Sequence, residues 1–263
     1  YKKYEADKEV HKKTIPAQEL FFDLLKERAE TGRIYIMNLD HCNSHSSFKD
    51  KISMSNLCQE ITLPTKPIQH IDDVNGEIAL CILSAINVGS INDLSELESV
   101  CDLAVRALDE IIDYQDYPVK AAEVSTKARR SLGIGYIGLA HYLAKMDLKY
   151  SDPKAWEAVD RLSEAFQYYL LRASCNLAEE KGKCSAFDRT KYADGLLPID
   201  HYKKEVDEIV PHKTRMAWES LRKDIAKHGL RHSTLSAQMP SESSSVVSNE
   251  TNGIEPPRAI LSI

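Results

Sequence analysis

This chain of 263 residues lacks the features of several large classes of protein. No apolar run approaches the roughly 18 residues that a membrane span requires, and no signal peptide is visible at the N-terminal end. Lysine and arginine number 34 against 40 aspartates and glutamates. Nucleic-acid-binding surfaces need a basic excess, and short clusters such as Lys127-Ala128-Arg129-Arg130 do not supply one. We therefore expect a soluble protein that binds neither membranes nor nucleic acids.

The six cysteines are dispersed and contain no C-x-x-C pair. This spacing excludes a zinc ribbon and a small secreted disulfide scaffold, and it fits a reducing, cytoplasmic setting. The segment His41-Cys42-Asn43-Ser44-His45 offers three metal-ligating side chains, but no second cluster matches it. We predict a polar loop there and no metal site in the chain.

What is present favours an α/β architecture with many long helices. A hydrophobic content of 43% and a charged content of 28% are ordinary for a globular protein. Apolar residues at helical spacing predict helices over residues 15–31, 95–112, 153–182 and 214–228. Residues 33–39 are predicted to form a strand, and residues 77–88 a buried strand or a short helix. We find no internal repeat and no linker that marks a domain boundary.

The most informative motif is Ser-Asn-Leu-Cys-Gln-Glu, which places a thiol between a carboxamide and a carboxylate. In an extended segment side chains alternate between two faces. Asn56, Cys58 and Glu60 would then point into one pocket, while Leu57 and Gln59 point elsewhere. An amide, a sulfur and a base on one face are typical of a catalytic site. A buried structural cysteine in a strand is the alternative, and spacing alone leaves both open.

A second motif is the serine-rich segment that follows Met239-Pro240. Its four hydroxyls in five residues resemble an anion cradle, because hydroxyls and exposed backbone N–H groups can hold a phosphate. A flexible serine-rich linker is the alternative. The apolar residues before and after the segment speak against a linker.

The segment Leu132–Gly138 satisfies the pattern G-x-G-x-x-G. A dinucleotide site requires a strand directly before the pattern and an acidic residue about 20 positions later. The preceding residues, 126–131, make a poor buried strand, and Asp152 introduces a helix. We interpret the glycines as a means of close packing. Cys81 lies in an apolar run and, taken alone, would be a core cysteine.

Together these segments resemble the large catalytic subunit of class I ribonucleotide reductase, most of all its bacterial and phage aerobic form. The resemblance covers essentially the whole chain, in order. The matching stretches are Gly32–Ile36, Asp40–Asn43, Ser55–Ile61, Leu63–Pro67, Asn75–Cys81, Asp113–Pro118, Leu132–Gly138, and Met239–Glu242 through Asn252–Arg258.

The resemblance implies a role for each motif. Cys58 matches the cysteine that becomes a thiyl radical and abstracts the 3′ hydrogen of a ribonucleotide. Glu60 matches the base for the 3′-hydroxyl proton, and Asn56 the amide that binds the substrate hydroxyls. Cys81 matches one of two cysteines that reduce the 2′ position and end as a disulfide. The residues expected to line the substrate are Asn56, Leu57, Cys58, Gln59, Glu60 and, for its phosphates, Pro240, Ser241, Glu242, Ser243 and Ser244.

The resemblance also implies parts outside this chain. The expected fold is part of a ten-stranded α/β barrel, with the radical cysteine on an internal finger loop. Residues 1–263 would be the central to C-terminal part of that barrel, without the C-terminal tail. The specificity-effector loops and the N-terminal ATP-binding cone would lie upstream, so ATP and dNTP effectors would bind regions outside this chain. Both ends of the chain resemble cuts through a larger protein, and the partner of Cys81 is expected upstream. No cofactor is expected to bind this segment directly, and we expect it to be inactive alone.

The implied activity is the reduction of ribonucleoside diphosphates to 2′-deoxyribonucleotides, in the cytoplasm of a bacterium or of a phage's host. The expected partners are a metal-containing small subunit that supplies the radical, the remaining parts of the large subunit, and thioredoxin or glutaredoxin through the absent tail. Glu60 speaks against the anaerobic glycyl-radical class. A cobalamin-dependent reductase and a non-catalytic, split-gene half that only docks remain as alternatives.

Overall fold

The computed structural model describes residues 2–209 and 213–259, and the chain divides into two units, Tyr1–Met37 and Asn38–Ile263. The first unit contains α1 (Lys2–Ala6) and α2 (Ala17–Thr31). The second contains two strands, β1 (Ile82–Asn87) and β2 (Leu132–Ile137). Its helices are α3 (Leu39–His45), α4 (Glu96–Tyr114), α5 (Lys120–Arg129), α6 (Leu139–Ala144), α7 (Pro153–Lys181), α8 (Pro198–His201), α9 (Trp218–His228) and α10 (Glu242–Ser248). Four short 3₁₀ helices are η1 (Val88–Ser90), η2 (Phe187–Arg189), η3 (Lys191–Asp194) and η4 (Lys204–Glu208).

In the first unit, the predicted helix over residues 15–31 is confirmed as α2. It ends at Gly32, whose left-handed φ of 64° lets its N–H donate to the carbonyl of Arg28 at 2.9 Å. The predicted strand over residues 33–39 is wrong, because residues 33–38 have no regular structure and α3 begins at Leu39. A strand needs partners for its backbone groups, and the carbonyl of Ile34 instead accepts a hydrogen bond from the Arg28 side chain.

In the second unit, β1 and β2 pair in parallel, with Ile82 opposite Leu132 and Asn87 opposite Ile137. A third segment continues this arrangement, because Ser236 forms a parallel bridge with Ile134. The N–H of Ile134 donates to Leu235 at 2.8 Å, and the N–H of Ala237 donates to Ile134 at 3.2 Å. All six residues of β2 are buried, as expected for a strand covered on both faces. The strand alternative for residues 77–88 is confirmed by β1.

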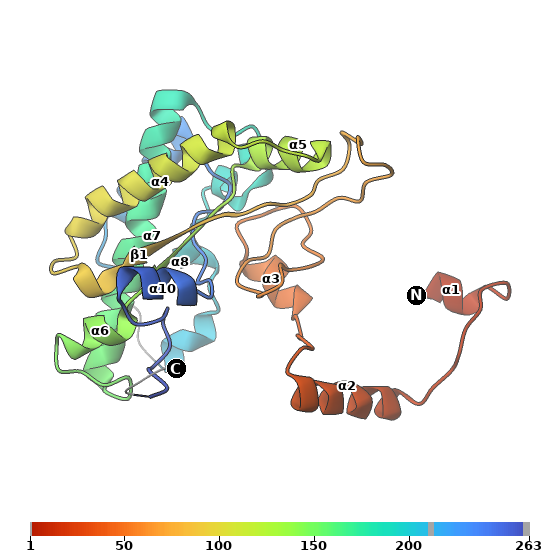
Figure 1. The fold of residues 1–263 in the computed structure, drawn as a ribbon. Coiled ribbons are helices and arrows are strands. Elements are labelled where there is room, and N and C mark those ends of the chain that lie inside the picture. The colour runs from red at the N-terminus through yellow and green to blue at the C-terminus, as the bar shows by residue number, and fades with distance from the viewer. Residues whose placement is uncertain (1, 210–212, 260–263) are drawn as a thin grey trace. The chain divides into compact units, whose positions relative to one another are not determined.

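The helices α4 and α7 pack against each other, and α4 also packs on β1 (Figure 1). In α4 the buried apolar residues recur every three or four positions, at Leu97, Cys101, Val105, Leu108 and Ile112, as a one-sided helix requires. The predicted helix over 153–182 is confirmed by α7, which begins at Pro153 and stops before Gly182. The predicted helix over 214–228 is confirmed by α9, although it begins later, at Trp218. Among the described residues, no helix is both long and apolar enough to cross a bilayer.

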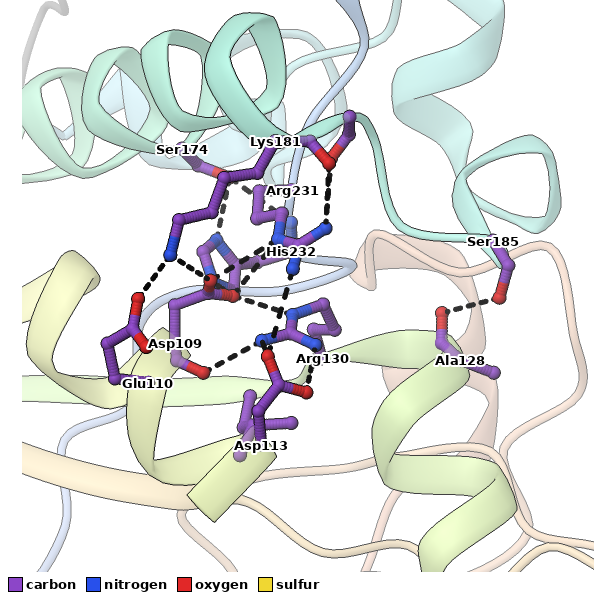
Figure 2. A network of polar contacts seen from close by, with 12 residues as sticks. Asp109, Glu110, Asp113, Ala128, Arg130, Ser174, Lys181, Ser185, Arg231 and His232 are labelled. Carbon is purple, nitrogen blue, oxygen red and sulfur yellow. Dashed lines mark hydrogen bonds and ion pairs between the residues drawn. The ribbon is translucent and has the colours of Figure 1, made fainter.

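A polar network joins α4, α7, the residue that ends α5 and the segment after α9 (Figure 2). The carboxylate of Asp109, which is fully buried, accepts hydrogen bonds from Arg130 at 2.6 Å and from Arg231 at 3.2 Å. His232 Nε2 lies 3.1 Å from Asp109 Oδ1, and His232 Nδ1 lies 2.9 Å from the Ser174 hydroxyl. Burial alone would raise the pKa of Asp109, but the hydrogen bonds from His232 and Arg130 outweigh it and lower that pKa. Burial lowers the pKa of His232 and favours its neutral form.

Candidate active site

A pocket of about 690 Å³ is lined by residues from two segments, 53–68 and 77–83. An antiparallel bridge joins these segments, since the N–H of Lys66 donates to Glu77 at 3.0 Å and the N–H of Glu77 donates to Lys66 at 2.9 Å. The first segment contributes Asn56 and Glu60, and the second contributes Cys81. Three of the predicted catalytic side chains therefore line one pocket.

The segment that carries Cys58 is a tight turn, so the prediction of an extended segment is wrong. The N–H of Gln59 donates to the carbonyl of Asn56 at 3.2 Å, and the N–H of Asn56 donates to that of Ile61 at 3.4 Å. Gln59 has a left-handed φ of 59°, which breaks the alternation of side chains. The Asn56 side-chain oxygen accepts the N–H of Ile61 at 3.4 Å and closes the turn.

This turn changes which residues face the pocket. Cys58 is exposed at the tip, and neither it nor Leu57 and Gln59 lines the cavity. Asn56 and Glu60, which flank the tip, do line it. The tip thus presents the thiol outward, while the residues on either side of it face the pocket.

Glu60 and Cys81 form the chemical centre of the pocket. One carboxylate oxygen of Glu60, Oε2, is buried and has no hydrogen-bond partner among the described residues. Burial, and second the negative charge of Glu60, raises the pKa of the Cys81 thiol to about 12. Cys81 is therefore a protonated thiol at neutral pH, beside a carboxylate that has a free oxygen. The thiol can therefore donate a hydrogen, and the carboxylate oxygen can accept a hydrogen bond.

Glycine at position 133 gives the Cys81 thiol its space. A Cβ at Gly133 would lie 2.6 Å from Cys81 Sγ, closer than side chains approach in proteins. At Gly135 a Cβ would lie 2.4 Å from the carbonyl of Ala237. The G-x-G-x-x-G pattern therefore lies mostly in a buried strand, where its glycines permit close packing, as predicted.

The serine-rich segment begins α10 and lies away from the thiol pocket. Ser241 is buried at the start of the helix, and its hydroxyl donates to Asn252 Oδ1 at 3.3 Å. The hydroxyl of Ser245 donates to the carbonyl of Ser241 at 2.6 Å. Pro240, Glu242, Ser243 and Ser244 are exposed. The first N–H groups of a helix have no carbonyl partner within it, so hydroxyls and free N–H groups do meet at this point.

None of residues 240–244 lines the thiol pocket, contrary to the expectation of one shared pocket. The parallel register explains the separation. Cys81 directly precedes β1, whereas the serine-rich segment follows the third parallel segment, beyond its carboxyl end. There the N–H of Gly138 donates to Thr251 at 2.9 Å and fixes the return of the chain to the end of β2.

The segment 41–45 forms the end of helix α3, so the predicted polar loop is wrong. Asn43 explains the difference. Its side chain donates to the carbonyls of Leu39 and Ile52 at 2.8 and 2.9 Å and accepts the N–H of Ile52 at 2.9 Å. Within residues 2–209 and 213–259, no group of three or more metal-ligating side chains is brought together.

Comparison with known proteins decides the family. A family model described as "Ribonucleotide reductase, barrel domain" matches residues 1–263. The chain belongs to this family. It is 59% identical over 266 residues to the ribonucleoside-diphosphate reductase subunit alpha of Haemophilus influenzae. The alignment covers 100% of this chain and 35% of that protein. The chain is 56% identical to the ribonucleoside-diphosphate reductase 1 subunit alpha of Escherichia coli and 43% identical to the ribonucleoside-diphosphate reductase subunit alpha of phage T4. Each alignment covers 100% of this chain and 35% of the relative.

Membership in the ribonucleotide reductase barrel family confirms the resemblance and the α/β fold class. The three parallel segments of the second unit, with helices between them, agree with part of such a barrel. The chain spans about a third of the length of the curated relatives that it matches.

The sequence reasoning missed the structural importance of Arg129 and Arg130 in this reductase domain. Both belong to the short basic cluster that was weighed only as a source of basic excess for nucleic-acid binding, yet both are almost completely buried. Their position within three residues of the start of a fully buried strand is the signal that could have found them, because a buried arginine requires carboxylate partners.

Proposed function

We propose that this chain supplies the thiol pocket of a ribonucleoside-diphosphate reductase large subunit, which converts ribonucleotides to 2′-deoxyribonucleotides. The observation that carries the proposal is that one pocket is lined both by the Cys81 thiol, whose pKa is raised, and by Glu60, one of whose buried oxygens has no hydrogen-bond partner among the described residues. The family and the names of the relatives support it.

In the proposed reaction Cys58, as a thiyl radical, takes the 3′ hydrogen of the ribose. Glu60 accepts the 3′-hydroxyl proton as general base, and Asn56 binds the ribose hydroxyls. The 2′-hydroxyl leaves as water, and Cys81 with a second cysteine outside this chain supplies two electrons and two protons. These two thiols become a disulfide, the 3′ hydrogen returns from Cys58, and the radical is regenerated.

The raised pKa of Cys81 suits this role. A thiol that stays protonated at neutral pH can deliver hydrogen to the 2′ position, whereas a thiolate would have no hydrogen to give. We assign the substrate phosphates to residues 240–244, where the free N–H groups of the first turn of α10 and the exposed hydroxyls of Ser243 and Ser244 are available.

Other parts of this proposal lie outside the chain. The resemblance assigns radical generation to a metal-containing small subunit, effector binding to other regions of the large subunit, and re-reduction to thioredoxin or glutaredoxin. We propose that the whole enzyme acts in the cytoplasm, where reduced thiols persist.

The test uses the full-length protein that contains this chain, together with its small subunit. Replacement of Cys58 by serine (Cys58→Ser) should abolish deoxynucleotide formation while substrate binding persists. Cys42 lies on α3, outside the pocket, so Cys42→Ser is the matched control and should keep its activity. Product formation by Cys58→Ser would overturn the proposal and favour a non-catalytic docking role.

A further inference from the structure

Four charged side chains form a closed ring next to the thiol pocket. Arg129 donates to Glu77 from Nε at 2.7 Å, and its Nη2 lies 2.9 Å from Asp50. Arg189 contacts the same two carboxylates, with Nε 2.9 Å from Asp50 and Nη1 2.9 Å from Glu77. Two arginines thus alternate with two carboxylates, and each carboxylate is shared by both arginines. We call these four residues the arginine ring.

The arginine ring is more than a set of surface ion pairs. The side chain of Arg129 is only 2% exposed and that of Glu77 only 14%. The guanidinium carbon of Arg129 lies 5.9 Å from the centre of the Phe48 ring. Burial lowers the pKa of Arg189, but its hydrogen bonds to Asp50 and Glu77 outweigh burial and raise that pKa overall. A buried guanidinium without its carboxylates would be strongly unfavourable, so the contacts of Arg129 fix its neighbours in place.

The position of the ring matters for the site. Asp50 directly precedes, and Glu77 directly follows, the segment 51–76, which contains Asn56, Cys58 and Glu60. Arg129 is the last residue of α5, three positions before β2. One guanidinium therefore holds both ends of this segment and attaches them to the end of α5.

Glu77 connects the ring to the pocket itself. It lines the cavity, and it lies four residues before Cys81 in the same segment. On the other side, the N–H of Lys49 donates to the carbonyl of Arg189 at 3.0 Å, which brings η2 to the start of the 51–76 segment. Closing a segment of this length has an entropic cost, which the ion pairs of the ring offset.

We infer that Arg129 is a positioning residue, which closes the base of the segment carrying Cys58 and Glu60 and thereby sets it against Cys81. This inference rests on the proposed function for its catalytic consequence. Its structural consequence is independent: loss of Arg129 should open the pocket at Cys81 and leave the core between α4 and α7 intact.

The experiment measures iodoacetamide labelling of individual cysteines by mass spectrometry in the full-length protein. In the Arg129→Gln variant, Cys81 should be labelled at least tenfold faster than in the wild type. Cys101 and Cys175, which are buried in α4 and α7, should keep their wild-type rates. Deoxynucleotide formation with the small subunit should fall at least tenfold, and Arg129→Lys should restore part of it, because lysine can still contact one carboxylate.

Two further variants complete the test. Arg106 forms an ion pair with Asp102 and Glu180 at the surface, so Arg106→Gln is the matched control and should change neither rate. If Arg129→Gln does not fold, Asp50→Asn removes a less buried member of the ring and should show the same selectivity.

Equal acceleration at all three cysteines, or unchanged labelling of Cys81, would overturn the inference, as would full activity in a variant that exposes Cys81. The labelling needs no turnover. Failure of this inference is therefore distinct from failure of the proposed function, which would appear as product formation by Cys58→Ser.

Discussion

The buried network around Asp109 and the thiol pocket differ in whether their buried carboxylate oxygens have hydrogen-bond partners. Asp109 accepts hydrogen bonds from Arg130, Arg231 and His232, and its carboxylate is completely buried. In the pocket, Glu60 keeps a buried oxygen that has no hydrogen-bond partner among the described residues, and outside the pocket Cys58 is exposed at the tip of a turn. Satisfied polar groups stabilise a core, whereas an unsatisfied group is available to a ligand. The difference separates the residues that hold the fold from those that we expect to react.

The largest expected effect is on activity, at the unsatisfied group. Glu60→Gln keeps the size of the side chain but removes the base, so deoxynucleotide formation should fall about 10²- to 10⁴-fold, the usual contribution of a general base. The measurement is the rate of product formation by the full-length protein with its small subunit. Glu157, an exposed glutamate on α7, offers the control Glu157→Gln, which should retain full activity. Comparable rates for the two variants would contradict the role of Glu60 as the general base.

The second effect is on stability, at the satisfied group. Asp109→Asn removes the buried negative charge to which Arg130, Arg231 and His232 are hydrogen-bonded, and should cost about 3 kcal/mol or more. Hydrogen–deuterium exchange of the α4 and α7 amides in the full-length protein measures this loss locally.

The neighbouring residue is the control for Asp109. Glu110 is 67% exposed and pairs with Lys181 at the surface, so Glu110→Gln should change exchange little. If both variants exchanged alike, the network would not be the stabilising feature that its burial indicates.

A smaller effect is expected from pH. Burial lowers the pKa of His232 below its ordinary value of 6.5, so the unfolded state binds a proton there that the folded state does not. Stability should therefore fall as the pH decreases below about 6.5. Asp109 also has a lowered pKa, but its contribution is lost only at pH values below the ordinary 3.8 of an aspartate.

The measurement is hydrogen–deuterium exchange of the α4 amides at pH 7.5 and 5.5, corrected for the intrinsic exchange rate. Between these two pH values the contribution of His232 to stability changes, whereas that of Asp109 does not. His232→Gln retains a donor and an acceptor but has no titrating proton, so its local stability should depend less on pH. An equal pH dependence in the variant would assign the effect to another group.

The sequence predicted well those features that depend on neighbouring residues. The spacing of Leu97, Cys101 and Val105 predicted α4, and Pro153 and Gly182 marked the ends of α7. The family resemblance predicted that Asn56, Glu60 and Cys81 share one site, and all three line one pocket.

The errors arose where distant contacts decide the structure. Residues 33–38 have strand-forming side chains but no strand partner among the described residues, so propensity alone misled. The left-handed conformation of Gln59 turned an expected strand into a turn. The carboxylate partners of Arg129 lie 52 and 79 positions away, so no local pattern could identify them.

The central claim is that Cys58, at the tip of the turn, and Cys81, in the pocket, act on one substrate, and oxidation of Cys81 in a single turnover tests it most directly. The full-length protein and its small subunit would receive substrate without external reductant, and Cys81 would then be titrated with an alkylating agent after denaturation. We predict that Cys81 becomes inaccessible to alkylation in proportion to the deoxynucleotide formed, and that it stays fully alkylated in the Cys58→Ser variant. Deoxynucleotide formation that leaves Cys81 fully alkylated would contradict the account.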